Sequence, residues 1–311
     1  MIRRVAILGE MGTGNLGDDY GFLLLRDELL AAFSELDVLV NVLPLSGQAG
    51  LDMNTWHAVV TGCGTLLDEV RGAYVHRLLV ADCPIAILGT GTADSRYATP
   101  TPEGRRALRN VLKVSSYTWR RGEEGPDTGW LAGWRRLDQA VDSGACGINE
   151  GPAAHNLAPL DPERIIDVRS RLHRPSRLVA AFVHDLNHLT PLLMRGEPDA
   201  FMVDGTRRSF AALSSLSTIL CRRIHLGVMA ACCGVHPVLL DYSAKVRKVF
   251  EGTSVAHTIL PPESTNTDIA RTLDGNLPSP DRTTVEEAQT ACRDHVRRAA
   301  SAIAAEWGIA P

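Results

Sequence analysis

Short apolar runs alternate along this chain with helical patterns of about ten to fifteen residues. In the first half of the chain the apolar runs cover residues 5–8, 38–43, 58–61, 84–88 and 114–119. A second series covers residues 178–183, 200–203, 218–221 and 238–241. Strands that alternate with helices in this way form parallel sheets with crossover helices. The sequence therefore predicts an α/β protein with two Rossmann-like domains, whose strand ends surround one central cleft.

The weakest apolar pattern separates the two series and marks the predicted domain boundary. Residues 143–176 are rich in Gly, Pro, Ala and Asn. We therefore predict an N-terminal domain over residues 1–150, and a linker over 151–176. A C-terminal domain follows over 177–283. Residues 284–311 carry a strong helical pattern, and this helix could pack back on the N-terminal domain.

Composition narrows the class of protein. The 311 residues are 45% hydrophobic and 22% charged, and the net charge is -4. This charge disfavours a nucleic-acid-binding surface, and no stretch approaches the roughly 20 apolar residues of a membrane helix. The seven cysteines are odd in number and show no C-x-x-C spacing. We expect a cytoplasmic protein without structural disulfides, without a nucleic-acid partner and without a membrane segment.

The first glycine-rich turn follows the first strand and reads G-T-G-N-L-G-D-D over residues 12–19. Its glycine spacing is that of a dinucleotide-binding turn. However, Asp18 and Asp19 would repel a phosphate and instead suit the positive end of a helix. A third reading is that Asn15 and one of these carboxylates bind hydroxyl groups of a sugar-like substrate.

Two further glycine turns follow strands of the first series, at residues 62–68 and 89–92. Glycine lets a ligand or another loop approach the backbone closely. The substrate-binding residues predicted from these turns are Gly62, Gly64, Thr65, Asp68, Gly89 and Gly91. Cys63 could act as a nucleophile, but no nearby base is evident.

Charged side chains close two other strands. Arg120 and Arg121 end the fifth strand, and they are either a solvated basic pair or ligands for an anion. His184 begins a His-Asp-x-x-His pattern after the strand at 178–183. The pattern lacks a convincing third metal ligand, so we expect a polar edge of the cleft and no metal.

The most informative stretch is residues 217–246, which reads as strand, helix, strand. Arg223 and His225 lie where the first of these strands ends and the helix begins. A permanent cation beside an imidazole suits an anionic substrate that needs a proton. The plainer interpretation is an arginine at a helix start and a histidine in the core.

Taken together, these motifs resemble those of the polysaccharide pyruvyl transferase family. The matching segments, in family order, are 14–18 (G-N-L-G-D), 62–64 with Asp68, 84–91, 223–225 (R-I-H), 234–238 and 241–245 with Lys245. The chain departs from the family at Arg120 and Arg121, where an Arg-Asp pair is usual. Residues 140–215 match poorly.

The resemblance implies a GT-B-like fold and transfer of a pyruvyl group from phosphoenolpyruvate to two hydroxyls of a sugar, which gives a ketal. It implies that the domain over 1–150 is on the acceptor side and the domain over 177–283 on the donor side. It also implies that His225 is the general acid. Arg223, with Arg120 or Arg121, would hold the carboxylate and phosphate of the donor. No cofactor beyond this co-substrate and no metal is required.

Other functions stay open at this stage. The chain could be a glycosyltransferase-like enzyme or a tailoring enzyme that acts on a small natural product. It could also be a non-catalytic member that binds a glycan or scaffolds a partner, although Arg223 and His225 weigh against this reading. The acceptor, the linkage positions and the oligomeric state are not predicted.

Overall fold

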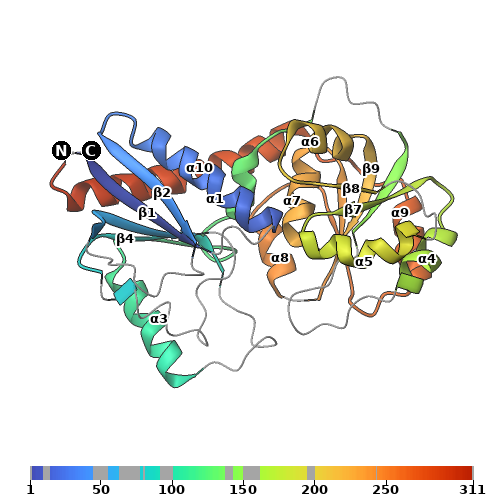
Figure 1. Ribbon diagram of the computed structural model, residues 1–311, viewed down its shortest axis with the longest axis horizontal. Helices are drawn as coiled ribbons and strands as arrows, with labels where there is room; N and C mark the ends of the chain where they lie inside the picture. Colours follow the sequence, from blue (N-terminus) through green and yellow to red (C-terminus); the bar gives the residue numbers. More distant parts are fainter. Residues whose placement is uncertain are drawn as a thin grey trace. The chain divides into compact units, whose positions relative to one another are not determined.

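The chain forms two compact units, each built on a parallel sheet (Figure 1). The computed structural model describes residues 2–9, 15–44, 55–62, 78–79, 81–91, 101–136, 143–149, 162–194, 200–242 and 244–309. The first unit comprises Met1–Thr13, Gly17–Leu131 and Gln289–Pro311, and the second comprises Gly14–Leu16 and Ala132–Ala288.

The sheet of the first unit has the strand order β2-β1-β3-β4-β5, and all its neighbours are parallel. Its strands are β1 (Arg3–Gly9), β2 (Val38–Pro44), β3 (Ala58–Gly62), β4 (Ile85–Thr90) and β5 (Tyr117–Arg120). The helical elements that contribute to this unit are α1 (Leu16–Ala32), α3 (Pro102–Val114), the 3-10 turn η2 (Thr128–Ala132) and the later part of α10 (Arg282–Glu306). This is a doubly wound order whose reversal lies between β1 and β3.

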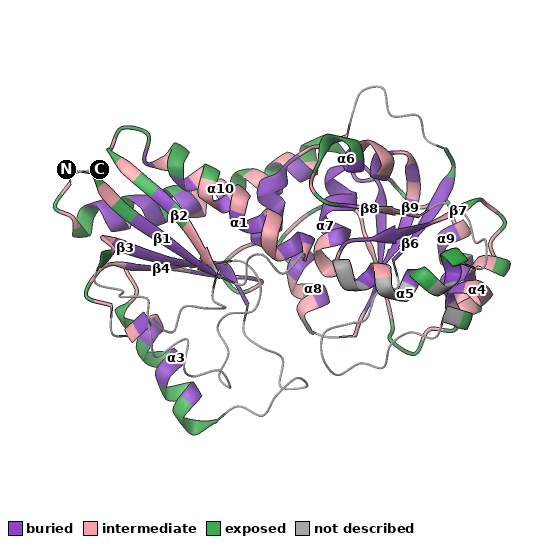
Figure 2. Ribbon diagram, viewed as in Figure 1, coloured by how far each residue is buried: buried purple, intermediate pink, exposed green. Residues whose placement is uncertain are grey.

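Burial explains why these runs form strands. Every residue of β3 and β4 is buried, and so are the last five residues of β1 (Figure 2). A central parallel strand is covered on both faces, so it is apolar throughout rather than alternating. Helix α3 packs on the same core through Ala107 and Val111. It begins at Thr101, whose Oγ1 accepts a hydrogen bond from the Gly104 amide at 2.9 Å, and Pro102 suits its first turn.

The sheet of the second unit has the order β11-β10-β9-β6-β7-β8, again with parallel neighbours. Its strands are β6 (Ala145–Asn149), β7 (Ser176–Ala180), β8 (Ala200–Met202), β9 (Leu216–Cys221), β10 (His236–Leu240) and β11 (Thr258–Leu260). Its helices are α4 (Pro162–Ser170), α5 (Val183–Met194), α6 (Arg207–Ser214), α7 (Ile224–Cys232), α8 (Ala244–Phe250) and α9 (Asn266–Asp274), together with the start of α10. Counted along the chain, this is the Rossmann order 3-2-1-4-5-6.

The predicted fold class is confirmed, because both units are Rossmann-like α/β domains. The predicted boundaries differ from those of the structure. β6 lies before residue 150 but is a central strand of the second sheet, and α4 lies inside the predicted linker at 151–176. The run A-C-G-I-N is short and contains glycine, so its apolar signal is weak although all five residues are buried.

The segment at 261–283 contains helix α9. A capping box starts this helix: the Asp268 amide donates to Thr265 Oγ1 at 3.1 Å, and the Thr265 amide donates to Asp268 Oδ2 at 3.1 Å. Such reciprocal bonds satisfy two amides of the first helical turn. Ile269 and Leu273 then bury the apolar side of α9 in the core of the second unit.

The closing helix α10 contributes residues from position 289 onward to the first unit. His295 stacks on Trp119 with ring centroids 4.7 Å apart, and its Nδ1 lies 2.7 Å from the Tyr117 hydroxyl. Arg293 donates to Glu28 at 2.8 Å. The two His295 contacts lie on β5, the strand at one edge of the first sheet, and the Arg293 contact joins α10 to α1.

No helix in the described part of the chain is both long and apolar enough to cross a membrane. Burial raises the pKa of the Cys83 and Cys146 thiols to about 11, so both stay protonated near neutral pH. The described cysteines are all free: Cys83, Cys146, Cys221, Cys232, Cys233 and Cys292.

Candidate functional site

The order of the second sheet singles out one place for a ligand. From β6 the chain proceeds to β7 and β8 on one side, and from β9 to β10 and β11 on the other. In open parallel sheets, ligands bind outside the carboxyl ends of the strands at this reversal. Here that place is the end of β6 at Asn149 and the end of β9 at Cys221, which are paired across the sheet.

Asn149 is fully buried and joins three segments at this edge. Its Nδ2 donates to the Val179 carbonyl at 2.9 Å and to Asp185 Oδ2 at 3.1 Å. Its Oδ1 accepts from the Arg223 amide at 3.1 Å. A buried amide whose groups all have partners fixes the surrounding backbone. Asn149 therefore holds the ends of β6, β7 and β9 in register.

Asp185 and Arg223 form an ion pair beside Asn149. Asp185 Oδ1 accepts from Arg223 Nε at 3.0 Å and from Nη2 at 2.8 Å, while its Oδ2 also accepts from the Ala181 amide at 3.0 Å. The side chain of Asp185 is 1% exposed and that of Arg223 is 15% exposed. The Arg223 guanidinium also lies 4.8 Å from the centre of the Phe182 ring.

This arrangement changes the predicted role of Arg223. We expected its guanidinium to bind a donor anion, but in the structure a buried carboxylate already balances its charge. An anionic ligand at Arg223 must share the guanidinium with Asp185. Asp185 belongs to the His-Asp-x-x-His pattern that we expected at a polar edge of the cleft, but its pairing with Arg223 was not predicted. Asn149 was not singled out, because β6 itself was missed.

Helix α7 begins immediately after Arg223, which is its N-cap and makes no side-chain capping bond to the helix. The amides of a first helical turn point out of the helix, and with the helix dipole they favour an anion. His225 is the second residue of α7 and is partly buried. Its assignment as a general acid stays a prediction.

Two other predicted residues belong to the same unit. Lys245 is the second residue of α8, which follows β10, and it is partly buried. Asn15 forms an isolated antiparallel bridge with Phe182, and the Leu16 amide donates to the Ala181 carbonyl at 3.0 Å. Asn15 therefore lies against the segment of Phe182, whose ring contacts the Arg223 guanidinium.

Asp18 and Asp19 lie in the first turn of α1, where both are partly buried. Their carboxylates are at the positive end of the helix, which is the placement that the capping interpretation requires. The division between the two units falls just before them, after Leu16. A role in binding sugar hydroxyls stays a prediction.

The carboxyl edge of the first sheet also carries a buried ion pair. Arg121 Nη1 lies 2.8 Å from Asp127 Oδ2, and the two side chains are 2% and 0% exposed. Asp127 Oδ1 also accepts from the Gly129 amide at 2.7 Å. Arg121 is therefore not part of a solvated basic pair, and its buried charge is matched within the domain. Its role as an anion ligand stays a prediction.

Arg120 points differently from its neighbour and is 30% exposed. Its guanidinium pairs with Glu123 and with Glu124, the latter at 3.1 Å. The Arg120 amide also donates to Glu124 at 2.7 Å. Arg120 therefore belongs to a local turn with two carboxylates of its own, and its role as an anion ligand stays an untested prediction.

The predicted glycines are explained by protein packing. A Cβ at Gly91 would lie 2.4 Å from Arg121 Nη2. A Cβ at Gly62 would lie 2.7 Å from Leu25 Cδ2, and Gly89 has a φ of 61° and faces Thr128. We expected a ligand or another loop to approach these turns. At Gly91 the space is filled by the protein's own guanidinium.

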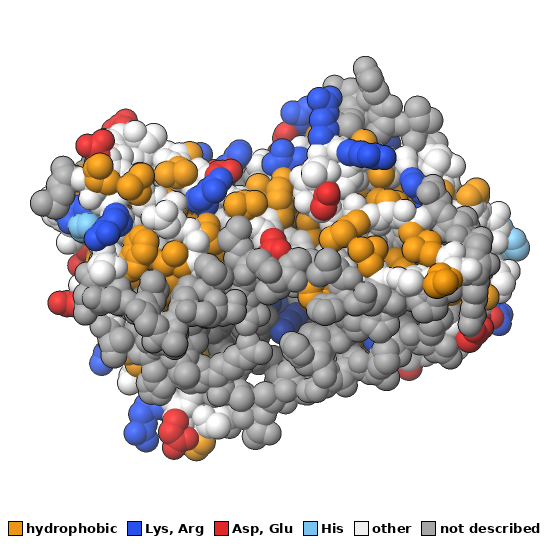
Figure 3. All heavy atoms as spheres, viewed as in Figure 1, with side chains coloured by type: hydrophobic (Ala, Val, Ile, Leu, Met, Phe, Trp, Pro, Cys, Tyr) orange, Lys and Arg blue, Asp and Glu red, His pale blue; other side chains and the backbone are white. Residues whose placement is uncertain are grey.

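Part of the predicted site lies outside the described residues: Cys63, Gly64, Thr65 and Asp68, together with the side chain of His184. Within the described residues, no group of three His, Cys, Asp or Glu side chains gathers in a way that could hold a metal ion. On the face drawn in Figure 3, basic and acidic side chains both occur in the described part of the surface.

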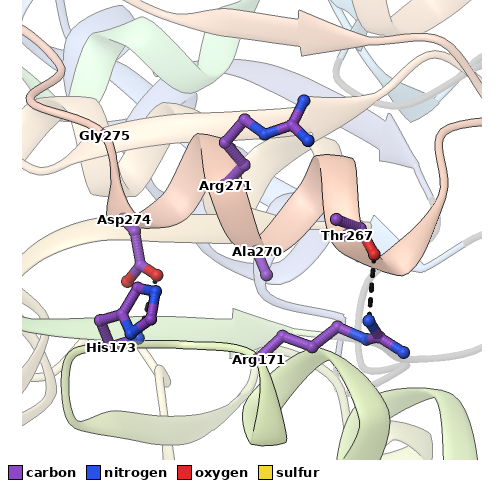
Figure 4. A pocket seen from close by; sticks show the side chains of 7 residues that line it. All are labelled: Arg171, His173, Thr267, Ala270, Arg271, Asp274 and Gly275. Atoms are coloured by element: carbon purple, nitrogen blue, oxygen red, sulfur yellow. Dashed lines mark hydrogen bonds between the residues drawn. The ribbon is translucent and has the colours of Figure 1, made fainter.

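A cavity of about 300 Å³ lies elsewhere in the second unit, between α9 and the turn before β7. Figure 4 shows that Arg171 reaches toward Thr267, while the guanidinium of Arg271 points in another direction. Arg171 is also paired with Asp167 at 2.8 Å. The cavity lies near the amino ends of the strands, because His173 precedes β7. It is therefore at the opposite end of the strands from the Asn149–Asp185–Arg223 cluster.

No protein-family model matches the sequence, and no curated protein sequence matches it. The fold is similar to that of the UDP-GlcNAc 2-epimerase of Methanocaldococcus jannaschii, solved with UDP-GlcNAc and UDP. The TM-score is 0.55 at 8% identity, covering 91% of this chain and 98% of that one.

Anabaena Alr3699/HepE, solved with UDP-glucose, gives a TM-score of 0.53 at 10% identity, covering 97% of this chain and 95% of that one. At such low identity these likenesses establish the fold. The chain has two Rossmann-like domains of the GT-B kind, and the reversal point of the second domain carries the Asn149–Asp185–Arg223 cluster.

Proposed function

We propose that this protein is a GT-B-like transferase that moves a sugar from a nucleotide diphosphate to a hydroxyl group of a small natural product or glycan. One observation carries the proposal. At the strand reversal of a Rossmann-ordered sheet, helix α7 begins directly beside the Asn149–Asp185–Arg223 cluster. That edge is the usual ligand site of such a sheet.

The start of α7 suits a diphosphate. Amides of the first turn, aided by the helix dipole, bind phosphate oxygens without a full counter-charge. Asn149 accepts from the Arg223 amide and so fixes the point at which α7 begins. The partly exposed guanidinium of Arg223 supplies further donors toward the ligand. A site of this kind accepts a diphosphate whose charge is moderate and spread over two groups.

The chemistry follows from this placement. The acceptor oxygen forms a bond to the anomeric carbon of the sugar, the bond from that carbon to the diphosphate oxygen breaks, and the acceptor hydroxyl releases its proton to solvent water. Negative charge grows on the departing phosphate. Amides of α7 stabilise that charge, and His225 in the same turn donates a proton or hydrogen bond to it.

The similar structures agree with this proposal. The M. jannaschii epimerase was solved with UDP-GlcNAc and UDP, and the Anabaena protein with UDP-glucose. Both were therefore solved with ligands that carry a uridine diphosphate group. Because the identities are only 8% and 10%, this agreement supports the class of donor and not its sugar.

Pyruvyl transfer from phosphoenolpyruvate is the second candidate, and the ordered sequence motifs, with R-I-H at 223–225, favour it. In that reaction His225 protonates the methylene carbon, a sugar hydroxyl adds to the neighbouring carbon, and phosphate leaves. Against it stands the pairing of Arg120, Arg121 and Arg223 with carboxylates. A trianionic donor needs a surplus of positive charge, and these three pairs supply none.

A melting-temperature titration separates the two candidates. UDP-glucose, UDP and phosphoenolpyruvate are each added to the protein over a range up to millimolar concentrations. We expect the uridine nucleotides to raise the melting temperature. A ligand at 100 times its dissociation constant stabilises by about 2.7 kcal/mol. A shift with phosphoenolpyruvate and none with either nucleotide would replace the first candidate by the second.

A further inference from the structure

We infer that Asp185 is a specificity-determining residue, which lowers the charge of the Arg223 site and so favours a diphosphate, whose charge is spread over two phosphate groups, over a free phosphate that concentrates its charge on one group. The inference rests on the proposed function, because it concerns the same donor site. A buried carboxylate that a ligand need not touch would thus determine whether the site prefers a diphosphate or a free phosphate.

The hydrogen bonds of Asp185 hold its carboxylate in place. Its Oδ1 accepts from Arg223 Nε and Nη2, and its Oδ2 accepts from the amide of Ala181 and from Asn149 Nδ2. With a side chain 1% exposed, Asp185 has no route by which to turn away from the site when a ligand arrives.

Arg223 retains donors for a ligand in spite of this pair. A guanidinium has five N–H donors, and Asp185 engages Nε and Nη2. Nη1 carries two further N–H groups, and the side chain is 15% exposed. A ligand at Arg223 can therefore accept hydrogen bonds from a guanidinium whose positive charge is balanced by Asp185.

This balance discriminates by ligand charge. A phosphate that reaches Arg223 also comes within a few ångströms of the Asp185 carboxylate, which repels each additional negative charge. A phosphodiester group can accept the same hydrogen bond from Arg223, but it carries less charge than a free phosphate group. Removing the Asp185 charge should therefore strengthen the binding of free phosphate much more than that of a nucleotide sugar.

The first domain provides a matched control. Arg121 and Asp127 form the same type of pair at the same distance, 2.8 Å, but both side chains are sealed from solvent. Asp127→Asn should weaken the fold without altering the preference among anions. Asp185→Asn should alter that preference.

The experiment uses melting-temperature titrations of the full chain with UDP-glucose, inorganic phosphate and phosphoenolpyruvate. For Asp185→Asn we expect the affinity for phosphate and for phosphoenolpyruvate to rise about tenfold relative to UDP-glucose, the size of one unit charge at a partly exposed site. In the double variant Asp185→Asn/Arg223→Gln the gain should disappear. An unchanged ratio in folded Asp185→Asn overturns the inference.

Arg223→Gln keeps the inference testable if Asp185→Asn does not fold. That variant leaves the carboxylate without its cation, so phosphate should be rejected more strongly than UDP-glucose, and an unchanged ratio again overturns the inference. The proposed function fails separately, if the wild-type protein responds to phosphoenolpyruvate and not to UDP-glucose. In that case the effect of Asp185→Asn on phosphate binding still decides the role of Asp185.

Discussion

Each of the two domains carries an arginine–aspartate pair at the carboxyl edge of its sheet, and the two pairs differ in surroundings rather than in chemistry. Both have a shortest distance of 2.8 Å. Arg121 is 2% exposed and lies against Gly91. Arg223 is 15% exposed and is the N-cap of α7.

Topology accounts for the difference. The first sheet reverses between β1 and β3, whereas Arg121 follows the edge strand β5. The second sheet reverses between β6 and β9, and Arg223 follows β9. Only the second pair therefore lies where a parallel sheet opens to a ligand. An arginine after a strand is informative when its strand borders the reversal.

The largest effect on turnover should come from His225→Gln. Glutamine keeps the size and some of the hydrogen bonding of histidine but cannot deliver a proton at neutral pH. We expect turnover to fall by roughly 10²–10⁴-fold, the range for a positioned acid or base. The measurement is the rate per folded molecule together with the melting temperature.

Arg223→Lys is the matched variant, because lysine keeps the positive charge but lacks the paired N–H groups of the guanidinium. Its main effect should be weaker binding of the donor rather than slower turnover. If His225→Gln lowers the melting temperature sharply and leaves the rate per folded molecule unchanged, His225 is a core residue.

The buried Arg121–Asp127 pair of the first domain should instead have the largest effect on the free energy of unfolding. Arg121→Met leaves the Asp127 carboxylate buried without its cation, a change that costs about 3–5 kcal/mol. Urea unfolding measures this loss, and the double variant Arg121→Met/Asp127→Leu should recover most of it. Binding of UDP-glucose by the folded fraction should not change. A loss of donor affinity would mean that the two edges are not distinct in function.

These pairs also show what the sequence can and cannot reveal. The alternation of apolar runs predicted the fold, and the positions of Arg121, Arg223 and His225 after strands were readable. The partner of Arg223 was not, because Asp185 lies 38 residues from Arg223 in the chain. Strand β6 was not predicted, because its sequence A-C-G-I-N is short. Without this strand, neither the reversal point of the second sheet nor Asn149 could be located.

Gly91→Ala should have a smaller effect on the same sealed region. The added methyl group would lie 2.4 Å from Arg121 Nη2, so the guanidinium must move within a closed space. Overpacking of this kind costs about 1–3 kcal/mol. A double-mutant cycle with Arg121→Met gives the test: Gly91→Ala should be nearly neutral in that background. Equal losses in both backgrounds would show that Arg121 does not explain the glycine.

The smallest effect should be a pH dependence of stability, to which a buried histidine in each domain contributes. Burial lowers the pKa of His295, aided by Arg298, and burial also lowers the pKa of His236. His236 lies 2.6 Å from the Pro278 carbonyl and 2.9 Å from the Thr258 hydroxyl. A histidine with a lowered pKa in the folded state stabilises the fold above its ordinary pKa near 6.5.

That stabilisation is lost as the pH falls below about 6.5, because the unfolded chain then binds the proton more readily. The melting temperature should therefore decrease from pH 7 toward pH 5. His295→Phe keeps a ring on Trp119 and removes the titration, so its decrease should be shallower. A curve parallel to that of the wild type would exclude His295 as a source of the pH dependence.

The central claim is that the donor binds at the open edge of the second sheet. A crystal structure of the protein with UDP-glucose tests it most directly. We expect the diphosphate oxygens within hydrogen-bonding distance of the amides of Ile224 and His225 at the start of α7, with Arg223 still paired to Asp185. A donor bound only at the first sheet, near Arg121, would contradict the claim.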